Sequence, residues 1–371
     1  MNGKRNIPFF NYPALFLCHE QEMTKVLLEV LSRGAYILQK DVEEFETNLA
    51  KYLNAKHVIG VANGTDALML ALRATEIQPG DEVILPSHTY VATAASVHFL
   101  GARPVLVESG PDHLIDPKAV QAAITKNTRV IMPVQLNGRT CDMDELQEIA
   151  DRYRLQIVED AAQGLGSRFK GRFAGTFGVA GTISFYPAKV LGCFGDGGAV
   201  VTNDDDVAET IYLLRDHGRN KEGEVVAWGF NSRLDNIQAA VLNFKLKTYN
   251  KEVERRRRVA GMYDDGLRDL PELHLPPPPS SDPNHFDVYQ NYEIEAENRD
   301  ELRLFLEQCG IKTLIQWAGK AVHQHSGLGF NVNLPRTDEL FKRCLMLPMN
   351  TFISDDEVLY VIDAIRRFYQ E

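Results

Sequence analysis

The chain has 371 residues, a length that suggests about two domains, and its 44% hydrophobic and 25% charged residues are ordinary for a soluble globular protein. The net charge of -11 argues against a general nucleic-acid surface, and no apolar run approaches the ~18 residues that span a bilayer. The five cysteines include no C-x-x-C pair, so we expect neither a metal site nor a disulfide framework.

The N-terminal residues Met1–Asn6 are basic, but they lead into Pro8 and Pro13 instead of an apolar signal core. A secretory signal would need such a core. The N-terminal sequence therefore predicts a cytoplasmic protein.

Strand-like and helix-like segments alternate from about residue 55 to residue 240. The expected strands are His57–Ala62, Asp81–Leu85, Arg103–Val107, Thr128–Val134 and Leu155–Glu159. Helices are expected at Asp66–Ala74 and Ala92–Leu100, from Asp116 and Pro117 onward, and at Asp142–Tyr153. Helices between successive strands predict a mainly parallel sheet covered on both faces, in a large α/β domain of residues 1–245.

The pattern changes after Arg233, and a smaller C-terminal α+β domain of residues 246–371 is expected. The segments predicted in this part are a long helix over Ile237–Leu270 interrupted near Gly261, a rigid proline-rich connection over 276–283, strands at Tyr289–Glu295 and Ile311–Trp317, a helix at Asp300–Gln308, and a last helix that begins with capping-box spacing at Ser354.

The run Ser184-Phe185-Tyr186-Pro187-Ala188-Lys189 leads into a glycine-rich stretch over 190–198. So many glycines indicate a turn rather than an ordinary helix face. Partial desolvation there would leave Lys189 a usable amine, which can form an imine with an aldehyde cofactor. A solvated loop lysine is the alternative.

A phosphate site is indicated where Asn63-Gly64-Thr65-Asp66 joins a strand to a helix. Glycine allows close backbone approach, and the helix start presents free N–H groups and the positive end of the helix dipole. Ser184 could add a hydroxyl. An ordinary helix N-cap explains the same junction.

Two side chains could contact a heterocyclic ring. Asp160 follows an apolar strand, where open parallel sheets place ligand contacts. As a buried carboxylate it would need a partner charge, such as a protonated pyridine nitrogen, with helix N-capping as the alternative. Tyr90 could lie flat on the ring, with a core position as the alternative.

Together these residues offer a phosphate cradle, a stacking ring, an acid for a ring nitrogen and an imine-forming lysine. Only pyridoxal phosphate needs all four, because its protonated ring accepts the electron pair released when a Cα–H bond breaks. Lys189 would anchor the aldehyde and then carry the proton between Cα and the cofactor carbon.

Five ordered motifs are Gly-Thr-Asp-Ala-Leu at 64–68, Pro-Ser-His-Thr-Tyr-Val-Ala-Thr at 86–93, Glu-Asp-Ala-Ala-Gln at 159–163, Ser-Phe-Tyr-Pro-Ala-Lys at 184–189 and Phe-Asn-Ser-Arg-Leu-Asp at 230–235. They resemble the DegT/DnrJ/EryC1/StrS family of sugar aminotransferases, which have the aspartate aminotransferase fold (fold type I). The resemblance covers nearly the whole chain and is strongest from residue 58 to residue 240.

The resemblance implies that Lys189 is the catalytic lysine bound to the cofactor, that Asp160 partners the ring nitrogen and that Gln163 lies near the ring hydroxyl. It also implies that phosphate contacts come from Gly64, Thr65 and Ser184 and that Tyr90 is the stacking aromatic.

Further implied roles concern the second subunit and the substrate. Asn231 matches an asparagine that reaches the phosphate from the neighbouring subunit, which implies a homodimer with shared sites. Arg233 would place an anionic substrate or form a structural salt bridge. His323 lies where the small domain would close over the sugar and is a candidate substrate contact.

Two segments depart from the family pattern. Gln135-Leu136-Asn137-Gly138 stands where the family often has His-Leu-Tyr-Gly, and Gln316-Trp317-Ala318-Gly319-Lys320 where it often has a His-Tyr-Pro segment. These departures put the substrate in doubt but not the reaction type.

The predicted reaction moves an amino group from an amino acid, L-glutamate by expectation, through pyridoxamine phosphate to the keto group of a nucleotide-linked keto-deoxyhexose in amino-sugar biosynthesis. One alternative is a sugar dehydratase on the same scaffold, but such relatives carry histidine in place of the anchoring lysine. Another is a non-catalytic cofactor-binding regulator, although nothing here resembles an appended DNA-binding helix pair.

Overall fold

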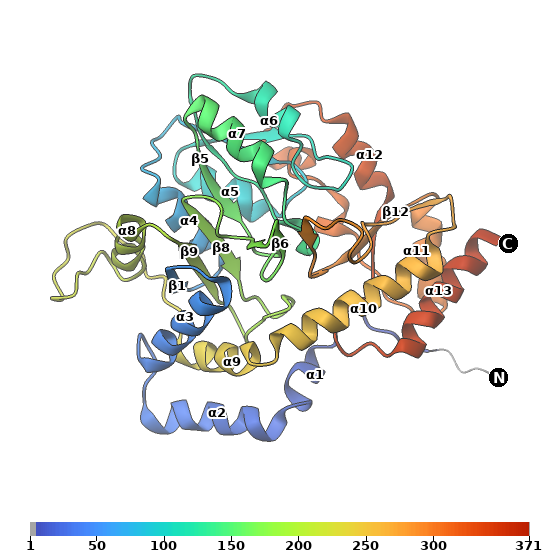
Figure 1. The fold of residues 1–371 in the computed structure, drawn as a ribbon, viewed down its shortest axis with the longest axis horizontal. Helices are drawn as coiled ribbons and strands as arrows, with labels where there is room; N and C mark the ends of the chain where they lie inside the picture. The colour runs from blue at the N-terminus through green and yellow to red at the C-terminus, as the bar shows by residue number, and fades with distance from the viewer. Residues whose placement is uncertain (1–4, 371) are drawn as a thin grey trace.

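A seven-stranded sheet forms the centre of the larger part of the computed structural model, which describes residues 5–370 (Figure 1). In spatial order its strands are β1 (His57–Val61), β9 (Gly198–Thr202), β8 (Ala180–Ser184), β5 (Gln156–Asp160), β4 (Thr128–Ile131), β2 (Glu82–Pro86) and β3 (Arg103–Val107). β9 is antiparallel to both of its neighbours, and the other pairs are parallel. The predicted mainly parallel sheet is confirmed, with β8 and β9 as strands that the sequence patterns did not indicate.

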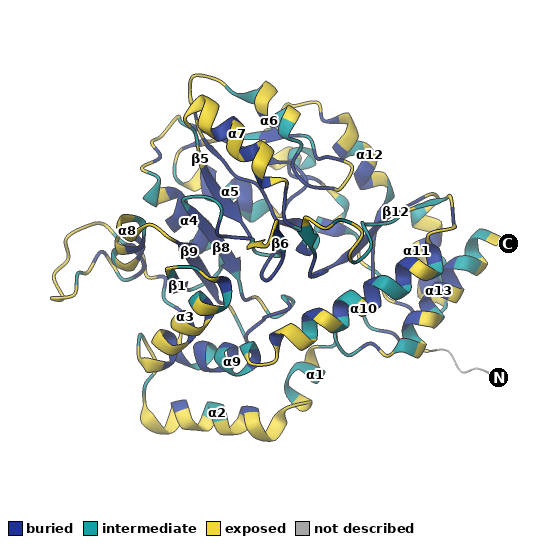
Figure 2. Cartoon of the chain, in the orientation of Figure 1, coloured by how far each residue is buried: buried dark blue, intermediate teal, exposed yellow. Residues whose placement is uncertain are grey.

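Helices cover both faces of this sheet, because successive residues of a strand point to opposite sides. Val83 and Val158 belong to the core that is shared with α4 (Gly64–Ala74), α5 (Val91–Phe99) and α8 (Asp205–Arg215). Their neighbours Ile84 and Ile157 face the other side, which is covered by α3 (Lys40–Leu53), α6 (Pro117–Ala123), α7 (Met143–Tyr153) and α9 (Asn236–Leu246). The strands are accordingly the buried centre of Figure 2.

A second, three-stranded sheet has the order β10 (Leu273–His274), β12 (Tyr292–Ala296) and β13 (Cys344–Leu347). It shares a separate apolar core with α10 (Tyr249–Leu267), α11 (Arg299–Gln308) and α13 (Asp355–Gln370). Ile7 joins this core and bridges to Ile311. The domain boundary near residue 245 stays a prediction.

The remaining elements lie outside these two sheets. A small third sheet pairs β11 (His285–Phe286) with β6 (Arg168–Phe169) and β6 with β7 (Arg172–Phe173). The other helices are α1 (Tyr12–Leu17), α2 (Glu20–Arg33) and α12 (Pro335–Arg343), with 3-10 turns at Leu136–Gly138, Gln316–Gly319, Val322–Gln324 and Ser326–Leu328. None of the helices formed by residues 5–370 combines the length and the apolar character that crossing a membrane requires.

The helix predicted over Ile237–Leu270 is interrupted, but the predicted position of the interruption, near Gly261, is wrong. The chain breaks between α9 and α10, around Thr248, and α10 continues through Gly261. Glycine in a helix costs about 1 kcal/mol relative to alanine, and here the buried neighbours Val259 and Tyr263 hold the helix in place.

The strand predicted at Ile311–Trp317 is also wrong. Ile311 makes an isolated bridge to Ile7, and Leu314 makes one to Met346. The segment therefore pairs briefly with two different neighbours and does not form a strand along either of them. It then enters a turn in which Trp317 has a φ of 51°. The predicted start of the last helix is confirmed, because the Ser354 hydroxyl accepts from the Glu357 N–H at 3.2 Å.

Candidate active site

The candidate site lies at the carboxyl ends of β5 and β8, which are parallel neighbours. Asp160 is the last residue of β5, and Ser184 is the last residue of β8. A small cavity beside them is lined by Gln163, Ser184 and Lys189, among other residues. The fold thus brings together predicted residues from two sequence motifs.

Lys189 sits on the turn after β8, where its backbone N–H donates to the Tyr186 carbonyl at 2.8 Å. The side chain is partly buried. Desolvation lowers the pKa of its ammonium group to about 8, although the negative charge of Asp160 opposes this shift. Near neutral pH a larger fraction of this amine is therefore uncharged than in an ordinary lysine, as a nucleophile requires.

Asp160 is 4% exposed and is held by two donors. Its Oδ2 accepts from the Thr93 hydroxyl at 2.8 Å and its Oδ1 from the Ala162 N–H at 3.1 Å. Burial raises the pKa of this carboxyl group, while these hydrogen bonds and the charge of Lys189 lower it. A positive group beside Asp160 would stabilise its charged form.

Thr93 is a positioning residue that the sequence reading did not single out. Its hydroxyl also lies 2.7 Å from that of Thr89, four residues earlier. Both hydroxyl residues were visible in the sequence, because Thr89 and Thr93 belong to the motif at 86–93.

The start of α4 lies against the end of β8. Asn63 caps the helix by accepting from the Asp66 N–H at 2.8 Å, and a Cβ atom on Gly64 would lie only 2.9 Å from the Ser184 Cβ. On β9, a Cβ atom on Gly198 would lie 2.4 Å from the carbonyl carbon of Asn63. Only glycine fits at these positions, and the helix N–H groups beside the Ser184 hydroxyl form a site that suits a phosphate.

Gln163 and Tyr90 belong to loops that follow β5 and β2. The Gln163 Oε1 accepts from the backbone N–H of Asn137 at 2.8 Å. Tyr90 is 56% exposed, so its alternative as a core residue is wrong. Its ring centre lies 5.4 Å from that of Trp317.

Within residues 5–370, Gln163, Ser184 and Lys189 are the predicted site residues that line this cavity, and the other predicted residues, Asn231, Arg233 and His323 among them, do not. Asn231 is exposed and makes an isolated bridge with Asp216, which directly follows α8. The segment after α8 projects at the left of Figure 1. The guanidinium group of Arg233 pairs with Asp216 at 2.8 Å. His323 is partly buried, with Nδ1 2.7 Å from the Ser87 hydroxyl and Nε2 3.0 Å from the Asp338 carboxylate.

The two segments that depart from the family pattern contact each other. Asn137 Oδ1 accepts from Gln316 Nε2 at 2.7 Å and from Asn291 Nδ2 at 3.0 Å. Asn137 Nδ2 donates to Glu293 at 2.9 Å. Because Asn137 also holds Gln163, this hydrogen-bond network connects the candidate site to β12. Nothing in the local sequence signals contacts over such separations.

Known proteins resemble the chain over almost its full length. A transaminase of Streptomyces venezuelae, named for dTDP-3-amino-3,4,6-trideoxy-alpha-D-glucose, is 42% identical and covers 98% of this chain and 96% of its own. A pleiotropic regulatory protein of Geobacillus stearothermophilus is 37% identical over 98% of this chain and 99% of its own.

The crystal structure of S. venezuelae DesV in complex with a ketimine intermediate superposes with a TM-score of 0.94, at 41% identity and 99% coverage of both chains. The family model of the DegT/DnrJ/EryC1/StrS aminotransferases matches residues 17–366. With the sheet-edge lysine and aspartate in place, the chain belongs to the DegT/DnrJ/EryC1/StrS aminotransferase family.

Proposed function

We propose that this aminotransferase moves an amino group from L-glutamate to the keto group of a nucleotide-linked keto-deoxyhexose, as a step in amino-sugar biosynthesis. The named activity of the Streptomyces relative supports this reaction and substrate class. The observation that carries the proposal is the partly buried Lys189, with its pKa lowered to about 8, interacting with Asp160 at the sheet edge where Gly64 meets Ser184.

The residues of this edge fit pyridoxal 5'-phosphate, with pyridoxamine 5'-phosphate as its aminated form. The α4 N–H groups near Gly64 and Thr65 and the Ser184 hydroxyl would bind the phosphate, and Asp160 would hold a proton on the ring nitrogen. Gln163 and Tyr90 would contact the ring hydroxyl and the ring face. When bound, this cofactor supplies an aldehyde carbon and a ring that accepts electrons.

Lys189 would act twice. Its uncharged Nζ would hold the cofactor through the aldehyde group. When it is not holding the cofactor, the same amine would accept and donate the proton that the reaction moves. Asp160 would remain ionised throughout, because a cationic partner offsets the desolvation of its carboxylate.

We also propose a homodimer in which Asn231 reaches the phosphate of the partner subunit. The projecting segment after α8 supports this, since Trp228 is 97% and Val225 68% exposed. Leu28 on helix α2 is likewise exposed. Figure 2 shows that most of α2 is exposed. Arg233 and His323 are proposed substrate contacts, although His323 would first have to release Asp338. The cytoplasmic location stays a prediction.

Replacing Lys189 tests the proposal directly. Borohydride reduction of the wild-type protein, followed by peptide mass mapping, should place the cofactor on Lys189. The Lys189→Ala protein should lose this label and at least about a hundredfold of its turnover with L-glutamate and a keto sugar, because its proton carrier is missing.

Lys245 provides a matched control. It is buried, its pKa is also lowered by burial, and its ammonium group donates to the Gly192 carbonyl at 2.6 Å. Lys245→Arg should keep the label on Lys189. A label on Lys245, or full turnover by Lys189→Ala, would contradict the proposal. A wild-type cofactor spectrum that no amino acid changes would favour the regulator instead.

A further inference from the structure

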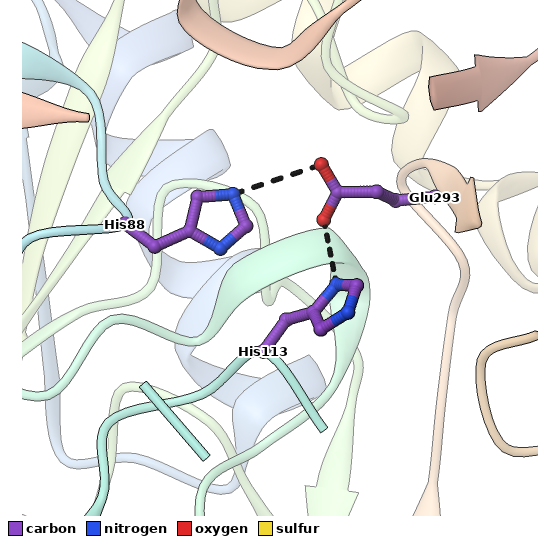
Figure 3. A group of neighbouring side chains, drawn as sticks. All are labelled: His88, His113 and Glu293. Atoms are coloured by element: carbon purple, nitrogen blue, oxygen red, sulfur yellow. Dashed lines mark hydrogen bonds and ion pairs between the residues drawn. The ribbon is translucent and has the colours of Figure 1, made fainter. Parts of the chain in front are cut away.

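A buried cluster of three potential metal ligands lies outside the cofactor site (Figure 3). His88 follows β2, His113 lies on the turn between β3 and α6, and Glu293 is on β12. One ligand atom from each residue lies within 4.8 Å of the other two. Only the tertiary fold brings them together, which is why the cysteine pattern gave no indication of this cluster.

An ion pair explains part of the cluster. Nδ1 of His113 lies 2.9 Å from Glu293 Oε2, and Nε2 of His113 lies 3.3 Å from Glu295 Oε1. A protonated His113 therefore satisfies both of its own nitrogens and one oxygen of Glu293.

The ion pair leaves His88 unexplained. His88 is 0% exposed, and among residues 5–370 neither of its ring nitrogens has a hydrogen-bond partner. Glu293 Oε1 is buried without a partner as well. The ring of His88 points toward this oxygen, with Nε2 3.6 Å away, beyond hydrogen-bond length (Figure 3). Native structures rarely bury polar groups without hydrogen-bond partners, so a missing partner is indicated.

The 3.6 Å separation suits two ligands of one cation. Ligand atoms about 2.0–2.2 Å from a tetrahedral zinc ion lie roughly 3.4 Å apart. Two histidines and a glutamate are also a known ligand set for Zn²⁺. Glu295 beside the far nitrogen of His113 provides the carboxylate that commonly orients a metal-bound histidine.

We propose that His88, His113 and Glu293 bind a divalent transition-metal cation, with Zn²⁺ as the best match. A cavity of about 410 Å³ lined by His113 and Glu293 would admit the ion and leave room for a water as fourth ligand. The ion would tie the segment that carries Tyr90, two residues after His88, to the small sheet. This inference does not depend on the proposed reaction.

Metal content tests the proposal. The full-length protein with its cofactor, without an affinity tag, is equilibrated with Zn²⁺ and freed of excess, and bound zinc is measured by mass spectrometry. The exposed thiol of Cys18 could bind zinc adventitiously, so all proteins carry Cys18→Ser. We expect about one zinc per chain. Glu293→Gln and His88→Asn should weaken binding at least tenfold, and the exposed His98→Asn should not.

Cobalt gives a readout that does not depend on the variants. Co²⁺ bound to the Cys18→Ser protein should show the intense visible absorption of a tetrahedral site, and added Zn²⁺ should remove it. If the Cys18→Ser protein binds Zn²⁺ and Co²⁺ no more tightly than its His88→Asn variant does, or if Glu293→Gln retains full binding, the proposal is overturned. The cluster is then an ion pair with a proton on His113.

Discussion

The edge of the large sheet and the surface that β12 and the 316–319 turn present to it are built by different means. At the sheet edge, Asp160 and Ser184 are fixed by the strands that they terminate, and the start of α4 approaches Ser184 so closely that only glycine fits at position 64. Between them, Asn137 on the turn after β4 and Gln316 on the 316–319 turn are held by side-chain hydrogen bonds between distant segments. We therefore expect the sheet edge to set the chemistry and the side-chain network to set which substrate is accepted.

The largest expected effect of a change beyond Lys189 itself is at Asp160. Asp160→Asn removes the charge that would hold a proton on the cofactor ring, so turnover should fall by about a hundredfold or more while the label on Lys189 remains. Steady-state kinetics with cofactor-saturated protein measure this.

Glu159, the preceding residue on β5, is the matched control. It is fully buried and accepts from the N–H groups of Gly175 at 2.7 Å and Phe177 at 2.5 Å. Glu159→Gln should therefore lower the free energy of unfolding by roughly 1–3 kcal/mol, with little change in turnover of the folded fraction. If both variants lost turnover equally, the expectation that Asp160 acts in the reaction while Glu159 only stabilises the fold would be contradicted.

The sequence predicts the sheet edge well because its signals are local. A strand, a glycine and a helix start within ten residues define the α4 junction, and Asp160 directly follows its apolar strand. The sequence predicts much less on the other side. Gln316 meets Asn137 across 179 positions, and the chain at Trp317 turns with positive φ instead of continuing a strand. Such contacts depend on the tertiary fold, which periodicity does not encode.

An intermediate effect is expected where α4 meets β8. A Cβ atom on Gly64 would press on the Ser184 Cβ at 2.9 Å, and overpacking of this kind costs about 1–3 kcal/mol. Gly64→Ala should therefore weaken cofactor binding by roughly 5- to 150-fold, as measured by titrating the apoprotein with pyridoxal phosphate. Gly261→Ala, where nothing lies within 4 Å, should leave the affinity unchanged. If Gly64→Ala binds pyridoxal phosphate with unchanged affinity, the phosphate does not bind at this junction.

The smallest effect is expected in the side-chain network of Asn137 and Gln316. This change distinguishes the network from the sheet edge most sharply. Gln316 is 1% exposed, and its Nε2 is one of the two side-chain donors to Asn137 Oδ1. Gln316→Leu should raise KM for the keto sugar several-fold, with Lys189 labelled normally and the L-glutamate half-reaction unchanged. A double-mutant cycle with Asn137→Leu should give a coupling free energy of about 0.5–3 kcal/mol in urea unfolding, because the residues form one network.

Additive effects in that cycle, together with an unchanged KM, would mean that the network only supports the fold. A slower L-glutamate half-reaction would mean that Asn137, through Gln163, acts on the cofactor as well. Substrate choice and chemistry would then share one set of contacts, because Asn137 donates its N–H to Gln163 while its side chain binds Gln316. Measuring both half-reactions on one variant therefore decides whether the two regions are separable.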